Sequence, residues 1–108
     1  PVRRMLLNGF LADSEGNEDL HLAALDRAEA GTPELNWGDH YVDIDMYPDG
    51  RVVITQLEYL LEDVQKDNPP QTVITIAEAR KLILDWIEER DKWYAEREAQ
   101  RAAAGQSK

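Results

Sequence analysis

The chain has 108 residues, of which 43% are hydrophobic and 31% are charged, and its formal net charge is −10. This length fits one domain with a single modest core, and the hydrophobic content argues against global disorder. Cysteine is absent, which excludes disulfides, thiolate chemistry and a zinc ribbon, and no apolar run approaches the roughly 20 residues that span a bilayer. We therefore expect a cytoplasmic protein.

The negative charge is concentrated in the middle of the chain. Residues 13–67 contain fifteen acidic and three basic residues, for a net charge of −12, whereas residues 1–12 carry +2 and residues 68–108 are neutral overall. A field of this sign repels nucleic-acid phosphates and anionic membranes, and it steers cationic partners towards the protein. We therefore expect no nucleic-acid or membrane binding. The acidic residues either recruit a basic partner or only keep the protein soluble.

Two segments precede the first predicted strand. An apolar run from Met5 to Leu11 lies within residues 1–12, and its pattern fits a buried strand as well as a helix. Residues 13–17 form a turn cluster, after which Asn17 is placed to cap a helix that ends near Gly31. The apolar side of this helix is predicted to consist of Leu20, Ala24, Leu25 and Ala28.

The alternation from Tyr41 to Tyr47 predicts the first strand of a β-hairpin. Residues 48–50, Pro-Asp-Gly, have the composition of a turn, and the β-branched residues of 51–55 predict the second, antiparallel strand. One face of the first strand carries Val42, Ile44 and Met46, and the other carries Tyr41, Asp43, Asp45 and Tyr47.

Residues 57–66 have two interpretations. The spacing of Leu57, Leu60, Leu61 and Val64 is that of one or two helical turns, the interpretation that we favour. The same segment also alternates as an extension of the second strand. Residues 66–70, Lys-Asp-Asn-Pro-Pro, end either structure.

A long helix is predicted near the C-terminus. Thr75 and Glu78 match a capping box at its start. Its apolar stripe consists of Ala79, Leu82, Ile83, Trp86, Ile87, Trp93 and Tyr94. Trp86 is expected in the core, whereas Trp93 and Tyr94 are either core residues or half-exposed anchors.

Packing of this stripe on the apolar face of the hairpin predicts an α+β fold. An antiparallel hairpin or small sheet packs against a long C-terminal helix and a shorter N-terminal helix. We expect one domain over residues 1–98 and a frayed polar tail over residues 99–108, which contain no large apolar side chain.

Asp43, Asp45 and Asp49 raise the possibility of a metal loop. The EF-hand pattern fails, because the fifth and sixth residues counted from Asp43 are Tyr47 and Pro48. A Mg²⁺ or Mn²⁺ site with two carboxylates is an alternative to a solvated or protein-binding face. We expect no metal.

The histidines, His21 and His40, are candidates for a general base. The serines that could act as nucleophiles are Ser14 in the turn cluster and Ser107 in the tail, and no glycine-rich loop follows a strand to bind phosphate. We therefore expect no catalytic residue and no cofactor.

Aromatic residues and carboxylates are mixed around the hairpin. Trp37 lies in the preceding loop, and Tyr41 and Tyr47 flank Asp43 and Asp45 on one predicted face. Such a surface suits Arg and Lys side chains, because carboxylates supply charge-assisted hydrogen bonds and rings supply contact area and cation–π interactions. The alternative is a half-buried sheet face whose tyrosines only cover backbone.

The acidic hairpin from Asp43 to Gly50, the charge of residues 13–67 and the small α+β profile together resemble bacterial toxin-immunity proteins of the contact-dependent inhibition and polymorphic-toxin type. The resemblance implies binding to a basic protein, a cognate toxin domain that is often a nuclease, whose nucleic-acid cleft is covered by acidic side chains. The candidate contacts are Trp37, Tyr41, Asp43, Asp45, Tyr47, Asp49, Glu58 and Glu62.

Two other classes of function are compatible with the sequence. The amphipathic C-terminal helix is typical of an interface in a structural or regulatory subunit of a bacterial or phage assembly, in which the acidic residues serve solubility alone. A small metal-dependent enzyme would use Asp43 and Asp45 as metal ligands. The sequence does not set the oligomeric state.

Overall fold

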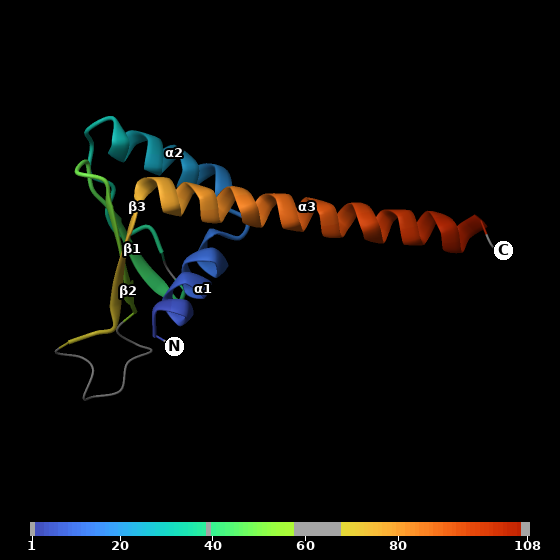
Figure 1. The fold of residues 1–108 in the computed structure, drawn as a ribbon, viewed down its shortest axis with the longest axis horizontal. Helices are drawn as coiled ribbons and strands as arrows, with labels where there is room; N and C mark the ends of the chain where they lie inside the picture. Colours follow the sequence, from blue (N-terminus) through green and yellow to red (C-terminus); the bar gives the residue numbers. More distant parts are fainter. Residues whose placement is uncertain (1, 39, 58–67, 107–108) are drawn as a thin grey trace.

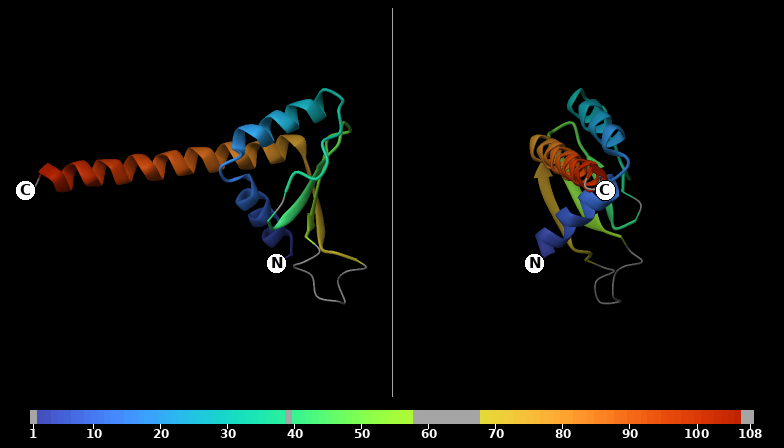
Figure 2. Two further views of the ribbon diagram at one scale, coloured as in Figure 1. Left: turned by 180° about the vertical axis from the view of Figure 1, so that it is seen from behind. Right: turned by 90° about the vertical axis from the view of Figure 1, so that its right-hand side faces the viewer.

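The computed structural model describes residues 2–38, 40–57 and 68–106. They form α1 (Val2–Ser14), α2 (Glu18–Glu29), β1 (Val42–Met46), β2 (Arg51–Gln56), β3 (Gln71–Thr75) and α3 (Ile76–Gln106). The strands make one antiparallel sheet in the order β1-β2-β3, and the helices lie on one of its faces (Figure 1, Figure 2). The predicted α+β class, with a long C-terminal and a shorter N-terminal helix, is confirmed. In the described part of the chain, no helix is long and apolar enough to cross a membrane.

β1 and β2 form the predicted hairpin. Ile44 lies opposite Ile54 and Met46 lies opposite Val52. Gly50 closes the turn at a φ of 97°, a left-handed conformation that glycine adopts without steric cost. The side chains of β1 that the alternation assigns to the core, Val42, Ile44 and Met46, are buried.

β3 is a strand that our sequence analysis did not predict. Its residues, Gln-Thr-Val-Ile-Thr, are mostly β-branched, and Val73 lies opposite Val53 of β2. The strand is short and runs directly into the capping box of α3, so the helix signal obscured it. The two interpretations of residues 57–66 stay predictions, because residues 58–66 of this segment lie outside the described part of the chain. Leu57 belongs to neither a helix nor a strand.

The ambiguous segment of residues 1–12 is a helix. α1 buries Leu6 and Phe10, which lie one helical turn apart, against the sheet. A Cβ atom at Gly9 would lie 2.9 Å from Val42 Cγ1, so the glycine permits the close approach of α1 to β1. The helix continues through Ser14, and the turn that follows is therefore shorter than the predicted cluster of residues 13–17.

α2 has nearly the predicted bounds, but two details of the prediction were wrong. Asn17 precedes the helix without a side-chain capping hydrogen bond, and its ψ of 22° departs from the extended conformation typical of a capping residue. Leu20 is 56% exposed instead of facing inward. His21 takes the inward position, because its Nδ1 lies 2.7 Å from Ser14 Oγ and so has a polar partner in the interior.

The predicted capping box of α3 is confirmed. The Glu78 N–H donates to Thr75 Oγ1 over 3.0 Å, and the Thr75 N–H donates to Glu78 Oε1 over 3.3 Å. Of the predicted apolar stripe, Ala79 and Ile83 are buried, while Leu82, Trp86 and Ile87 are only partly buried.

The distal half of α3 extends away from the rest of the molecule as a helical arm, residues 91–106 (Figure 1). Trp93 and Tyr94 are 49% and 58% exposed, so they lie outside the core. The helix continues to Gln106, whereas the sequence predicted a frayed tail from residue 99. Ala, Glu, Gln and Arg have high helix propensity, and extending a packed helix requires no new nucleus.

A buried carboxylate joins α1 to the start of β1. Both oxygens of Asp13 accept the N–H of Tyr41, at 3.2 and 3.1 Å, and Oδ2 also accepts the N–H of Val42 at 3.0 Å. Gly38 lies against the same site, where a Cβ atom would be 1.9 Å from the Val42 carbonyl oxygen. Hydrogen bonds to Asp13 therefore fix the chain before β1, and glycine at position 38 permits the close approach of the backbone.

We expect Asp13→Ala to lower the free energy of unfolding by about 2–3 kcal/mol, because it leaves the buried N–H of Val42 and the partly buried N–H of Tyr41 without their acceptor. Asp13→Asn keeps one carbonyl acceptor and should lose less. Urea unfolding followed by circular dichroism measures both. Asp19→Ala, at an exposed position of α2, is the control, and equal losses for Asp13→Ala and this control would contradict the role of Asp13.

Candidate functional site

The face of the sheet opposite the helices is free of helices in the described part of the chain (Figure 2). We call it the open sheet face. Strand alternation and the strand register place these side chains on it: Asp43, Asp45, Tyr47, Arg51, Val53, Thr55, Gln71 and Val73. Val53 and Val73 give it an apolar centre, and Val73 is 47% exposed.

Asp43 and Asp45 lie two residues apart on β1 and both point to the open sheet face. Burial and the nearby charge of Asp45 raise the pKa of Asp43 above its ordinary value. Asp45 Oδ1 accepts the N–H of Asn36 over 2.9 Å. Among the described residues, neither carboxylate forms an ion pair. The strand thus holds two half-buried, mutually repelling charges that a cation would stabilise.

Tyr47 and Asp49 already contact an arginine of this chain. The Arg51 guanidinium lies 4.7 Å from the centre of the Tyr47 ring, and its Nε donates to Asp49 Oδ2 over 2.7 Å. Hydrogen bonds from the side chain and the backbone N–H of Arg51 lower the pKa of Asp49. The sequence predicts that tyrosines and carboxylates here bind basic side chains of a partner, whereas in the structure Tyr47 and Asp49 contact Arg51 of the same chain.

Trp37 does not lie on the open sheet face. Its ring is partly buried edge-on against His21, with ring centres 5.5 Å apart and an interplanar angle of 86°. The Trp37 N–H donates to the Ile44 carbonyl over 2.9 Å, and the indole Nε1 donates to Glu34 Oε2 over 3.3 Å. The residue covers the outer edge of β1.

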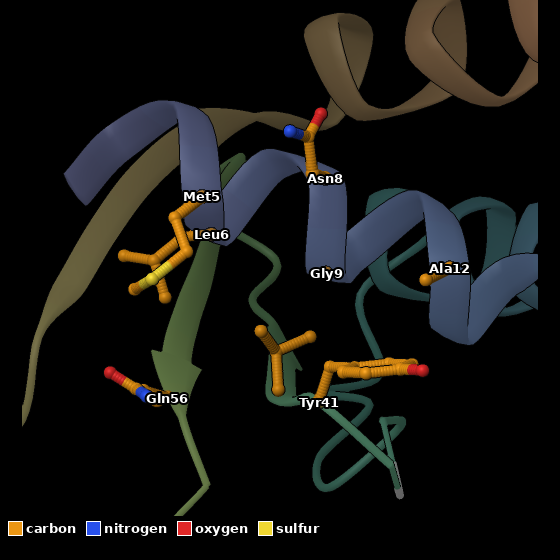
Figure 3. A pocket seen from close by; sticks show the side chains of 8 residues that line it. Met5, Leu6, Asn8, Gly9, Ala12, Tyr41 and Gln56 are labelled. Carbon is orange, nitrogen blue, oxygen red and sulfur yellow. The ribbon is translucent and has the colours of Figure 1, made fainter. Parts of the chain in front are cut away.

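Tyr41 is also displaced from the face that the alternation predicted. Its ring lies beneath α1, near Gly9 and Ala12, and lines an apolar groove of about 330 Å³ (Figure 3). Tyr41 precedes β1, and the hydrogen bond from its N–H to Asp13 turns the backbone towards α1. The remaining predicted contacts, Glu58 and Glu62, lie outside the described residues.

Ser14 and His21 are in contact, which the sequence analysis did not anticipate. The Ser14 hydroxyl donates to the Phe10 carbonyl over 2.9 Å, so it has no second proton to donate to His21. The 2.7 Å contact therefore assigns a proton to His21 Nδ1, with Ser14 Oγ as the acceptor. In this arrangement His21 does not act as a base towards Ser14, and the pair joins α1 to α2.

Two features of the site were missed from the sequence. Val73 was missed because β3 was not predicted, although residues 72–75 are all β-branched, which is typical of a strand. The hydrogen bond from the Asn36 N–H to Asp45 has only a weak signal in the sequence. Asparagine is one of the residues that favour a positive φ, and the φ of Asn36 is 61°. Across the described ranges, no cluster of three or more His, Cys, Asp or Glu side chains could hold a metal ion.

No protein-family model matches this chain, and neither the curated proteins nor the solved structures include a match to it.

The raised pKa of Asp43 predicts a pH-dependent effect of Asp43→Asn on stability. The folded state binds the Asp43 proton more tightly than the unfolded state, so wild-type stability falls relative to the variant as the pH rises from about 3.8 through the raised pKa. We expect the stability advantage of Asp43→Asn to be smallest in acid and largest at neutral pH. Urea titrations across this range measure it.

Asp19→Asn corrects for the general effect of removing one negative charge from an acidic protein. An advantage of Asp43→Asn that does not change with pH, after this correction, would contradict the environment assigned to Asp43.

Proposed function

We propose that this protein is a non-catalytic, acidic protein-binding module that acts as an immunity protein against a cognate bacterial toxin. In this proposal the open sheet face covers the active-site cleft of a basic toxin domain such as a nuclease. The observation that carries the proposal is the pair Asp43 and Asp45, half-buried on one strand face without a basic partner among the described residues.

The chemistry of the open sheet face supports a protein partner with Arg or Lys side chains. A guanidinium or ammonium group between Asp43 and Asp45 would relieve their mutual repulsion and gain charge-assisted hydrogen bonds. Val53 of β2 lies opposite Asp45, and Val73 of β3 lies opposite Val53 on its other side, where the exposed Val73 side chain offers apolar area. Interfaces combine such an apolar centre with polar surroundings.

The net charge of −10 supports fast association with a basic partner. Complementary charge raises the association rate more than it raises affinity, and salt weakens the effect. We infer that Asp43 and Asp45 contribute to both steering and contact. Tyr47 and Asp49 are peripheral contacts, because Arg51 must move before they can bind another cation.

A second candidate function uses the helical arm. Trp93 and Tyr94 pack edge-to-face with ring centres 5.0 Å apart, and both are exposed. Tryptophan and tyrosine are enriched among residues that dominate binding energy. This observation favours a structural or regulatory subunit that binds an assembly partner through α3.

The test compares three baits in lysate of the source organism: wild type, Asp43→Asn with Asp45→Asn, and a control. The control, Asp19→Asn with Glu88→Gln, removes the same charge from exposed positions of α2 and α3. We expect basic proteins to be retained by wild type and control, released by salt, and lost with the Asp43/Asp45 variant. With the purified partner, the Asp43/Asp45 variant should associate about tenfold more slowly at low salt.

Inhibition of the partner's toxic activity by wild-type protein completes the test. Equal capture and equal association rates for the Asp43/Asp45 variant and wild type would remove the open sheet face from the proposal. Salt-resistant capture that truncation after Asp91 abolishes would support the arm instead.

A further inference from the structure

The two outer edges of the sheet differ. Outside β1, the N–H and carbonyl of Glu34 pair with Met46 over 2.9 and 2.7 Å, so the segment before the hairpin covers that edge. Outside β3, the described part of the chain places no further strand (Figure 2, right). Within the described ranges, β3 is therefore an edge strand, and the backbone groups on its outer side face no further strand.

The register of β3 identifies these groups. The Gln56 N–H donates to the Pro70 carbonyl over 3.0 Å, and the Ile76 N–H donates to the Gly50 carbonyl over 2.9 Å. Because antiparallel pairs alternate, Thr72 and Ile74 direct their backbone groups towards β2, and Gln71, Val73 and Thr75 direct theirs outward.

The usable part of this edge is limited on both sides. The Thr75 N–H is already bound to Glu78 Oε1 in the capping box of α3. Pro69, the preceding outward position, has no N–H. Among the described residues, the N–H and carbonyl groups of Gln71 and Val73 thus form a window of four groups that face away from the sheet.

The edge lacks the charges that usually prevent strands from pairing between molecules. Residues 68–77 contain no charged side chain in a protein with a net charge of −10. Val73 is 47% exposed, and β-branched residues occupy positions 72–75.

We propose that this edge binds β3 of a second copy of the chain, antiparallel and about a two-fold axis at Thr72. Gln71 of each copy then exchanges two hydrogen bonds with Val73 of the other, which uses all four groups of the window on each side. An axis at Val73 would instead pair Gln71 with Thr75, whose N–H is occupied. The resulting sheet continues across both molecules.

Charge favours a second copy over a basic partner at this edge. A basic partner gains no ion pair from residues 68–77, whereas two acidic copies approach here with the least repulsion. Salt screens the remaining repulsion between the copies and should strengthen this pairing. Binding of a basic protein to the open sheet face responds to salt in the opposite direction, so failure of one proposal is distinguishable from failure of the other.

Val73→Pro tests the pairing. The substitution removes an outward N–H and leaves the hydrogen bonds between β2 and β3 intact. An edge strand tolerates proline at such an outward position. We expect wild-type protein to form a dimer whose population rises with protein concentration and with salt, and Val73→Pro to weaken it about tenfold or more. Sedimentation equilibrium gives the mass without an assumption about shape.

Val73→Thr is the matched control, because it keeps the N–H and the β-branched shape, and it should dimerise like wild type. A second measurement does not depend on the proline variant: amide exchange at Val73 in wild type should slow as the protein concentration rises. A wild-type protein that stays monomeric at all concentrations and salts, or a folded Val73→Pro variant that dimerises normally, would overturn the proposal.

Discussion

Asp13 is the penultimate residue of α1. Its carboxylate has no exposed surface and accepts hydrogen bonds from the N–H groups of Tyr41 and Val42. The rest of the domain depends on this contact, because it sets where β1 begins relative to α1. Ser14, the next residue, joins α1 to α2 through His21. With the helices held on one side and the segment from Glu34 to Trp37 held along β1, Asp43 and Asp45 are directed to the open sheet face.

The acidic residues of this protein are not equally available for binding. Arg80 binds Asp26 and Glu29, and Arg90 binds Glu18, so basic residues of α3 neutralise much of α2. Arg27 likewise binds Glu34. The exposed pairs among them add little stability individually, whereas Glu18 is buried beside Arg90, and together these pairs confine uncompensated charge to other surfaces. The open sheet face is one of these surfaces, which is why charge counted along the sequence overstates the number of binding acids.

Local sequence patterns predicted those helices and strands whose structure depends mainly on their own residues. The alternation of residues 41–47 and the capping box of Thr75 and Glu78 are of this kind. The site was predictable only in part, because three-dimensional contacts moved its members: Asp13 turns Tyr41 towards α1, and His21 draws Trp37 inward. β3 depends on pairing with β2, and His21 replaces Leu20 in the interior only because Ser14 is nearby.

The helical arm changes how this molecule moves through solution. The principal extents are 60 × 37 × 20 Å, and the radius of gyration is 17.2 Å, compared with about 13 Å for a compact domain near this length. A rod attached to a small body increases friction with little increase in mass. A monomer of 12.3 kDa will therefore elute from a gel-filtration column ahead of globular standards of its own mass, at a position that resembles a larger species.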